Sequence, residues 1–283
     1  MNMAMRNEIF ARLLRRPIPL LVLAAFALLA CASQASKDGF REIAPGIWLA
    51  EFDSPVKATT GTSKIIAVRA DPEKTNLALF MSSHTGGRLA TVKEWAEAGE
   101  LLACINASMY QADHKTSTGL MRRPGHVNNP RKNKRFGAYL LFDPSSADLP
   151  AFRMMDREDR SLKGSLKKYR SAVQNYRMIN SERKITWAAG GSATPIACVS
   201  VDGKGRALFI FSESLYTVHD FARAILLLPM DVRTTMYAEG GPPAGLYVSA
   251  GSVRKQWAGS FDLYPLPNVL GIVPRKAATA TGN

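Results

Sequence analysis

The segment Thr234–Val248 reads TTMYAEGGPPAGLYV, in which two apolar, strand-like stretches flank a turn of glycines and prolines. Glu239 stands where the first stretch ends. The paired glycines Gly240 and Gly241 allow positive φ angles and close approach of a second molecule, while the two prolines stiffen the exit from the turn. The pattern predicts a strand, a turn and a second strand, with a carboxylate placed to hold an anionic sugar derivative. A surface loop that carries a solvated glutamate is the alternative interpretation.

Strand-like stretches recur around this segment, with few helices between them. Strands are expected at residues 46–52, 64–69, 77–81, 101–107, 137–142, 193–201 and 206–211, the last two joined by an Asp202-Gly203-Lys204-Gly205 hairpin turn. Thr91 to Glu94 form a capping box that begins one helix, and Thr217 to Asp220 begin another. The order predicts a single domain of the α+β or mixed α/β class, with mixed β-sheets flanked by a few helices.

A polar, basic stretch from Arg153 to Arg183 separates the two halves of this pattern. Its charged residues are typical of a solvated helix or loop face. An active-site lid is the alternative interpretation, because long irregular segments in compact domains often carry function.

The first 31 residues have the composition of an export signal. Four arginines precede an apolar run from Pro17 to Ala30 that is too short to span a membrane comfortably. The sequence Leu28-Leu29-Ala30-Cys31 resembles a bacterial lipobox, so we expect Cys31 to be lipidated and the protein to be periplasmic and anchored to the outer membrane. Cleavage after Ala35, with release of a soluble protein, is the alternative. Residues 32–45 are then expected to be a tether, 46–275 the main domain and 276–283 a disordered tail.

The chain is strongly basic, with a net charge of +14 that falls only to +11 without the leader's four arginines and one glutamate. A basic surface favours anionic partners. Nucleic acid is not expected, because zinc-finger spacing, basic heptad helices and RNP-like aromatic strands are all missing from the sequence. An anionic envelope glycan, phosphodiester or lipid headgroup fits an exported protein better.

Cysteines and histidines give no sign of a cofactor. Cys104 and Cys198 lie in apolar stretches, where they could form a disulfide or remain buried free thiols, the interpretation that we favour. The four histidines lack metal-ligand spacing, and the sequence contains no Walker or Rossmann glycine motif. We therefore expect neither a metal nor a nucleotide cofactor.

A second group of polar residues follows the stretch at 101–107, in the sequence Ile105-Asn106-Ala107-Ser108-Met109-Tyr110. Polar side chains at a strand end can line a cleft. Asn106 can donate to and accept from a sugar hydroxyl or a phosphate, and Tyr110 can stack on a ring or donate its hydroxyl. An asparagine that satisfies the backbone groups of a turn is the alternative interpretation.

Together, these segments resemble the phosphodiester glycosidase family over roughly residues 46–274. The resemblance rests on the order of five elements: the Asn106 to Tyr110 motif followed by Gly119-Leu120, Tyr176 to Ile179, the Val201-Asp202-Gly203 hairpin, Thr217 to Phe221, and Tyr237 to Pro242. Three departures from the family pattern stand at Ser108 for glycine, Glu239 for aspartate and Pro242 for a third glycine. Ser192-Ala193-Thr194 also stands where many members have an arginine.

The resemblance implies an exported hydrolase that cleaves a sugar-1-phosphodiester, or a related anionic envelope glycan, at the anomeric carbon. It implies that Glu239 is the acid/base carboxylate, that the Gly240 and Gly241 amides form an anion-facing nest, and that Asn106 positions the substrate. The other expected substrate-binding residues are Ser108, Tyr110, Asp113, His114 and Gly119. Asp113 is the candidate for a second carboxylate, with a turn residue as the alternative.

Two other functions remain open from the sequence. A binding module for anionic cell-envelope glycan would use the same cleft and basic surface without turnover. A structural lipoprotein would keep the fold alone.

Overall fold

The computed structural model describes residues 36–259 and 264–275, all within one compact unit. The expected signal segment with Cys31 and the expected tail at 276–283 lie outside the described residues. Part of the expected tether is described, and its residues Arg41–Ala44 form the first strand. No helix in the described ranges is long and apolar enough to cross a membrane.

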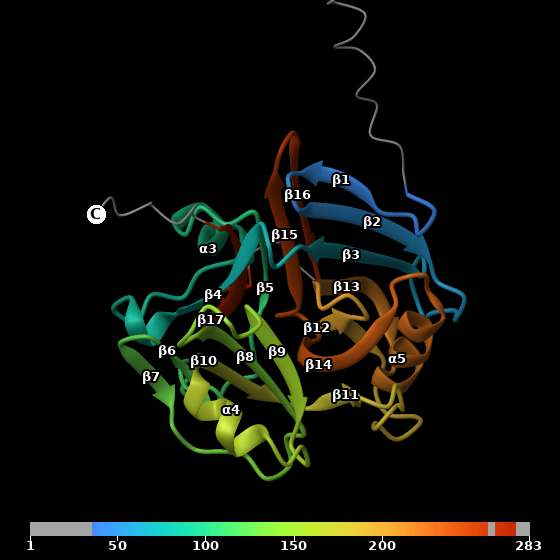
Figure 1. Ribbon diagram of the computed structural model, residues 1–283. Helices are drawn as coiled ribbons and strands as arrows, with labels where there is room; N and C mark the ends of the chain where they lie inside the picture. The colour runs from blue at the N-terminus through green and yellow to red at the C-terminus, as the bar shows by residue number, and fades with distance from the viewer. Residues whose placement is uncertain (1–35, 260–263, 276–283) are drawn as a thin grey trace, which may run out of the picture. The chain divides into compact units, whose positions relative to one another are not determined.

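Three sheets make up the described unit (Figure 1). The largest has seven strands in the order β1 (Arg41–Ala44), β2 (Ile47–Asp53), β3 (Lys64–Ala70), β13 (Ala207–Tyr216), β12 (Thr194–Asp202), β14 (Val232–Gly240) and β11 (Arg177–Ile179). The second has the order β7 (His126–Asn129), β6 (Met121–Arg123), β10 (Tyr169–Asn175), β8 (Ala138–Pro144) and β9 (Phe152–Asp156). The third has the order β16 (Val253–Ala258), β15 (Gly245–Ala250), β5 (Ala103–Asn106), β17 (Asn268–Pro274) and β4 (Thr75–Met81).

The inner faces of the three sheets share one hydrophobic core. Each sheet contributes alternate residues to it, for example Val199 from β12, Leu140 from β8 and Ile105 from β5. Because side chains alternate between the two faces of a strand, the intervening residues need cover on the outside. Apolar residues on both faces explain why β12 is a nearly continuous apolar run in the sequence.

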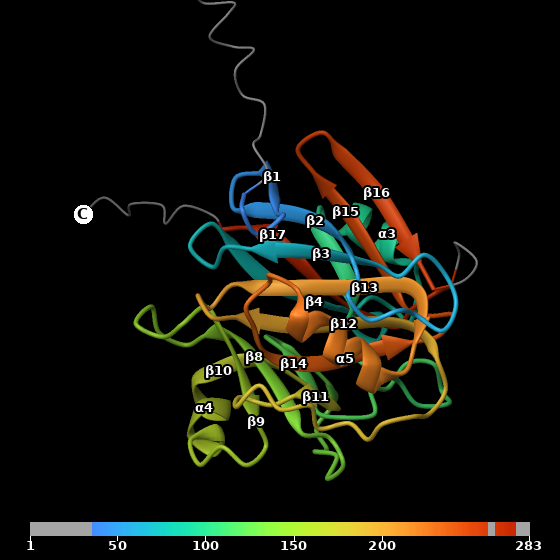
Figure 2. The same ribbon diagram turned by 90° about the vertical axis from the view of Figure 1, so that its right-hand side faces the viewer.

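A helix packs on the outer face of each sheet. α5 (Val218–Leu227) covers the seven-stranded sheet, α3 (Val92–Ala98) the third sheet and α4 (Leu162–Lys168) the second (Figures 1 and 2). A short 3₁₀ helix, η1 (Ser82–His84), follows β4. The predicted capping box is confirmed: the Thr91 side chain accepts from the Glu94 amide, and the Glu94 side chain accepts from the Thr91 amide. Thr217 caps α5 as expected.

The α+β class is confirmed in its coarse form, and strands dominate. The expectation of mixed sheets needs correction, because all the strand pairings of the described residues are antiparallel. The stretch from Arg153 to Arg183 is also not a solvated helix or loop. It contains most of β9, then α4, β10 and β11, and β10 is buried at six of its seven positions.

Candidate active site

The segment that contains Glu239 connects two sheets. β14 belongs to the seven-stranded sheet and β15 to the third sheet, so the turn at 241–244 carries the chain from one to the other. Gly241 has a φ of +74°, as expected for a turn that needs glycine. The predicted strand, turn and strand are confirmed, and Glu239 lies where the two sheets meet.

A β-bulge at Ala238 decides which way Glu239 points. Opposite β14, Cys198 pairs with Tyr237 and the neighbouring Ala197 pairs with Glu239, so Ala238 is an extra residue without a partner. In a regular strand Glu239 would share a face with Tyr237, which packs on the α5 side of the sheet. The bulge instead places Glu239 on the face of Ala197, which belongs to the inner core.

Glu239 is therefore buried, with 8% of its surface exposed, and it is not the solvated glutamate of the alternative interpretation. Burial raises the pKa of its carboxyl group to about 7, against an opposing hydrogen bond from the Gly240 amide to Oε1 at 3.0 Å. A carboxyl group with a pKa near neutrality can both take and give a proton at physiological pH, which suits general acid/base catalysis.

Two tyrosines, Tyr110 and Tyr237, lie near this carboxylate. Burial, a hydrogen bond with Tyr264 and the charge of Glu239 raise the pKa of Tyr110. Burial and the same charge raise the pKa of Tyr237. The phenols stay protonated, so they can donate hydrogen bonds near Glu239. The structure thus brings Tyr110 and Glu239 together, although they lie far apart in the sequence.

Asn106 links the two predicted motifs, but through the protein backbone. Its Nδ2 donates to the Pro243 carbonyl at 2.8 Å, and its Oδ1 accepts from the Gly245 amide at 2.8 Å. Both side-chain groups thus hold the turn that follows Glu239. The geometry matches the interpretation of Asn106 as a residue that satisfies turn backbone groups, and makes it a positioning residue for the Glu239 turn.

Ser108 and Gly119 belong to a buried polar network behind the site. The Ser108 amide donates to Asn268 Oδ1 at 2.9 Å, and its hydroxyl lies 3.3 Å from that of Ser117. A Cβ at Gly119 would lie only 2.5 Å from the Gln174 carbonyl, so no larger residue fits there without movement. These two residues shape the backbone around the site.

The nest expected from the Gly240 and Gly241 amides is absent. The Gly240 amide donates to Glu239 itself, and the Gly241 amide donates to the Pro195 carbonyl at 2.9 Å. Gly240 is needed for another reason: a Cβ there would lie 2.1 Å from the Tyr237 hydroxyl oxygen. The glycine makes room for the tyrosine rather than for an anion.

Asp113 and His114 lie on an exposed turn. The Asp113 carboxylate accepts hydrogen bonds from the Thr116 hydroxyl and from the Thr116 and Lys115 amides, the last two at 2.9 and 3.0 Å. These three hydrogen bonds lower the pKa of Asp113. This is the geometry of the turn-residue alternative, with no link to Glu239. His114 has a φ of +51°, and its ring centroid lies 5.5 Å from that of Tyr110.

Cys104 and Cys198 are free and buried, which confirms the interpretation that we favoured from the sequence. Burial raises the pKa of each thiol, so neither is a reactive nucleophile. Within residues 36–259 and 264–275, no group of three or more histidine, cysteine or acidic residues is placed to hold a metal ion.

Several residues near Glu239 were not recognised in the sequence. Tyr237 stands two positions before Glu239 and could have been found from that spacing. Asn175 donates from Nδ2 to the carbonyl of the bulge residue Ala238 at 3.1 Å, and Tyr264 contacts Tyr110. Neither Asn175 nor Tyr264 stands in a motif, so only the fold reveals them.

The raised pKa of Glu239 makes stability depend on pH. A folded-state pKa of about 7, above the ordinary 4.5, means that the folded chain binds the proton more tightly than the unfolded chain. Stability is thus lost as the pH rises through this window. We expect the free energy of unfolding of wild type, relative to Glu239→Gln, to fall by ~3 kcal/mol between pH 4.5 and pH 8. Urea unfolding of both proteins at each pH measures this difference, and parallel pH profiles would contradict it.

The sequence family of the chain follows from a comparison with family models. Residues 99–273 match the model described as phosphodiester glycosidase, which is more than half of the chain. The chain belongs to the phosphodiester glycosidase family. The matched region contains Asn106, Tyr110, Glu239 and the Ala238 bulge, so the family assignment covers the whole candidate site. The resemblance inferred from the motifs is confirmed.

Solved structures show the same fold at low identity. The zebrafish N-acetylglucosamine-1-phosphodiester alpha-N-acetylglucosaminidase catalytic domain, auto-inhibited by its pro-peptide, is 12% identical, with a TM-score of 0.57 over 86% of this chain and 87% of that one. A hypothetical protein from Synechocystis is 10% identical, with a TM-score of 0.54 over 82% of this chain and 62% of that one. No curated protein matches the sequence significantly. At these identities the likeness establishes the family's fold in this chain and nothing finer.

Proposed function

We propose that the chain hydrolyses the glycosidic bond of a sugar-1-phosphodiester or a related anionic envelope glycan. The observation that carries the proposal is Glu239, a buried carboxyl group with a pKa raised to about 7, aimed inward by a bulge in a member of this family. The basic character of the chain fits an anionic substrate, and the expected export would bring it to envelope glycans.

In this proposal Glu239 acts as a general base. It takes a proton from a water molecule whose oxygen attacks the anomeric carbon, and the bond between that carbon and the phosphate oxygen breaks. The phosphate monoester leaves with the electron pair. Because a phosphate is a good leaving group, the reaction needs less general-acid assistance than an ordinary glycoside does. Tyr110, protonated beside Glu239, can donate a hydrogen bond to the substrate.

Hydrolysis of a glycosyl-1-phosphodiester in ¹⁸O-labelled water tests the reaction. We expect free sugar to be released with the label on the sugar, because water attacks carbon. Label on the phosphate product would instead identify a phosphodiesterase and overturn the proposal. Tight binding without release of sugar would favour a binding module for anionic glycan.

A further inference from the structure

A cleft of about 390 Å³ opens beside β11, which is an edge strand of the seven-stranded sheet. Its walls include three arginines and two aromatic side chains; the full lining is Arg135, Gly137, Arg157, Tyr176, Arg177, Thr186, Trp187 and Ala188. None of the described residues that line it is acidic, although Asp156 and Glu158 next to the cleft pair with two of its arginines, Arg157 and Arg177. Planar guanidinium groups bind phosphate and carboxylate through paired hydrogen bonds.

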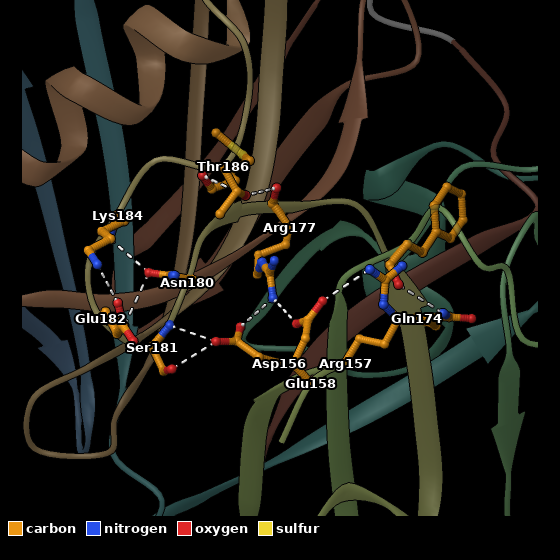
Figure 3. Close-up of polar contacts among 12 residues, drawn as sticks. Asp156, Arg157, Glu158, Gln174, Arg177, Asn180, Ser181, Glu182, Lys184 and Thr186 are labelled. Carbon is orange, nitrogen blue, oxygen red and sulfur yellow. Dashed lines mark hydrogen bonds and ion pairs between the residues drawn. The ribbon is translucent and has the colours of Figure 1, made fainter. Parts of the chain in front are cut away.

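Arg177 is held in place by the protein with part of its hydrogen-bonding capacity unused. Figure 3 shows its guanidinium between Asp156 and Glu158, where Nη1 makes both ion pairs, at 3.4 and 2.5 Å. Asp156 is in turn fixed by the amide and hydroxyl of Ser181, at 3.0 and 2.8 Å. A Cβ at Gly137 would lie 3.3 Å from Nε of Arg177, so the guanidinium lies close against that glycine. Nε itself makes no hydrogen bond with the described residues.

The other two arginines are available to a ligand at little structural cost. Arg157 donates to the Lys134 carbonyl and pairs with Glu158 at 3.0 Å. Glu158 therefore bridges Arg157 and Arg177 (Figure 3), and its side chain is 55% exposed, so an incoming anion can replace it. The exposed side chain of Arg135 makes no hydrogen bond or ion pair within the described ranges.

A line of aromatic rings leads from this cleft toward Glu239. Ring centroids lie 5.2 Å apart between Tyr176 and Trp187, and 5.4 Å apart between Trp187 and Tyr237. Arg177 pairs with Met236 across the β11–β14 ladder, three residues before Glu239. At about 3.3 Å per residue, the two positions lie roughly 10 Å apart along the strand. The cleft thus lies beside the strand that carries Glu239, at a position three residues before it.

We propose that this cleft binds a second phosphate of the substrate, carried by the sugar on the far side of the scissile phosphodiester, with that sugar's ring against Trp187. The inference rests on the proposed function and narrows its substrate class. The preferred substrate is an anionic glycan that carries a further phosphate on the sugar beyond the scissile phosphodiester. A substrate that has a neutral alcohol in place of this sugar phosphate would leave the cleft empty.

Binding can be measured without turnover in the Glu239→Gln protein, by titrating glucose 6-phosphate in a calorimeter. We expect binding that weakens about ten-fold with Arg177→Gln or Arg135→Gln, as expected for loss of a charged hydrogen-bond donor. Arg135→Gln removes no side-chain hydrogen bond or ion pair among residues 36–259 and 264–275, so it remains informative if Arg177→Gln fails to fold. The matched control is Arg160→Gln, an exposed arginine outside the cleft, which should bind as its parent does. Absence of binding, or equal binding by all three arginine variants, overturns the proposal.

Turnover separates this inference from the proposed function. Two glycosyl-1-phosphodiesters are compared, one with a simple alcohol and one with a sugar phosphate beyond the scissile phosphate. We expect the second to have a KM about ten-fold lower, and Arg135→Gln to remove most of that difference. Equal KM values with both substrates cleaved would overturn the cleft's role and leave the function standing. Binding of glucose 6-phosphate without cleavage of either substrate would overturn the function and leave the cleft as a sugar-phosphate site.

Discussion

Glu239→Gln is expected to lower kcat for a glycosyl-1-phosphodiester by about 10³-fold, with little change in KM. Glutamine has the same shape, and its Oε1 can still accept the Gly240 amide bond that the carboxylate accepts at 3.0 Å. The amide cannot take a proton from water, so the substitution removes the base and keeps the turn. Steady-state release of free sugar by the purified protein measures both constants.

A matched substitution tests whether the loss is specific to the site. Glu213 lies on β13 with an exposed side chain, and its Oε1 accepts the Ala258 amide at 3.3 Å, a hydrogen bond that glutamine can also accept. Glu213→Gln should therefore leave kcat and KM unchanged. If Glu239→Gln kept more than a tenth of wild-type kcat, another group would have to be the base.

Asp202→Ala is expected to lower the free energy of unfolding by ~3–5 kcal/mol, the usual effect of removing one partner from a buried ion pair. The Asp202 side chain is fully buried; it accepts from the amides of Lys204 and Arg206 at 2.9 Å and from Arg206 Nε at 2.7 Å. Arg69, whose side chain is 4% exposed, lies 3.6 Å from the same carboxylate. With alanine at 202, the buried charge of Arg69 would lose one of its two carboxylate partners. The amides of Lys204 and Arg206 in the hairpin turn would lose their hydrogen-bond acceptor.

Urea unfolding with a common m value measures this effect. An exposed pair supplies the comparison: Glu97 lies 3.8 Å from Lys93 on α3, and Glu97→Gln should change the unfolding free energy by less than ~0.5 kcal/mol. A loss of under ~1 kcal/mol for Asp202→Ala would show that Arg69 keeps sufficient support from Asp38, which it contacts at 2.6 Å.

Local signals in the sequence predicted those elements whose residues interact with near neighbours. The Thr91 capping box, the Thr217 cap and the turn at 202–205 each depend on residues within four positions, and each is confirmed. Strand β10 was missed for the opposite reason. Its sequence, YRSAVQN, looks solvated, but Gln174 and Asn175 are buried because partners remote in sequence, such as Phe136 and Ala238, accept their hydrogen bonds.

The candidate site was predicted in part for the same reason. Motif order linked Asn106, Tyr110 and Glu239, and the structure places Tyr110 near Glu239 and Asn106 against the turn that follows it, while their roles stay predictions. The assigned nest at Gly240 and Gly241 was wrong, since the acceptor of the Gly241 amide, Pro195, is on another strand. Two of the three cleft arginines, Arg157 and Arg177, stand in the 153–183 stretch, whose charges look like an ordinary solvated face.

The bulge at Ala238 makes the direction of the candidate carboxylate depend on the number of residues in β14. Side chains alternate along a strand, so inserting or deleting one residue before Glu239 turns its side chain from the core face of the sheet to the face that α5 covers. A single-codon deletion in β14 could thus remove the inward carboxylate while every core sheet kept its pairing partners. A single-codon insertion could create such a carboxylate in a relative that lacked it. If Glu239 acts as we propose, one genetic step that barely alters the composition of the protein is enough to gain or lose the catalytic carboxylate.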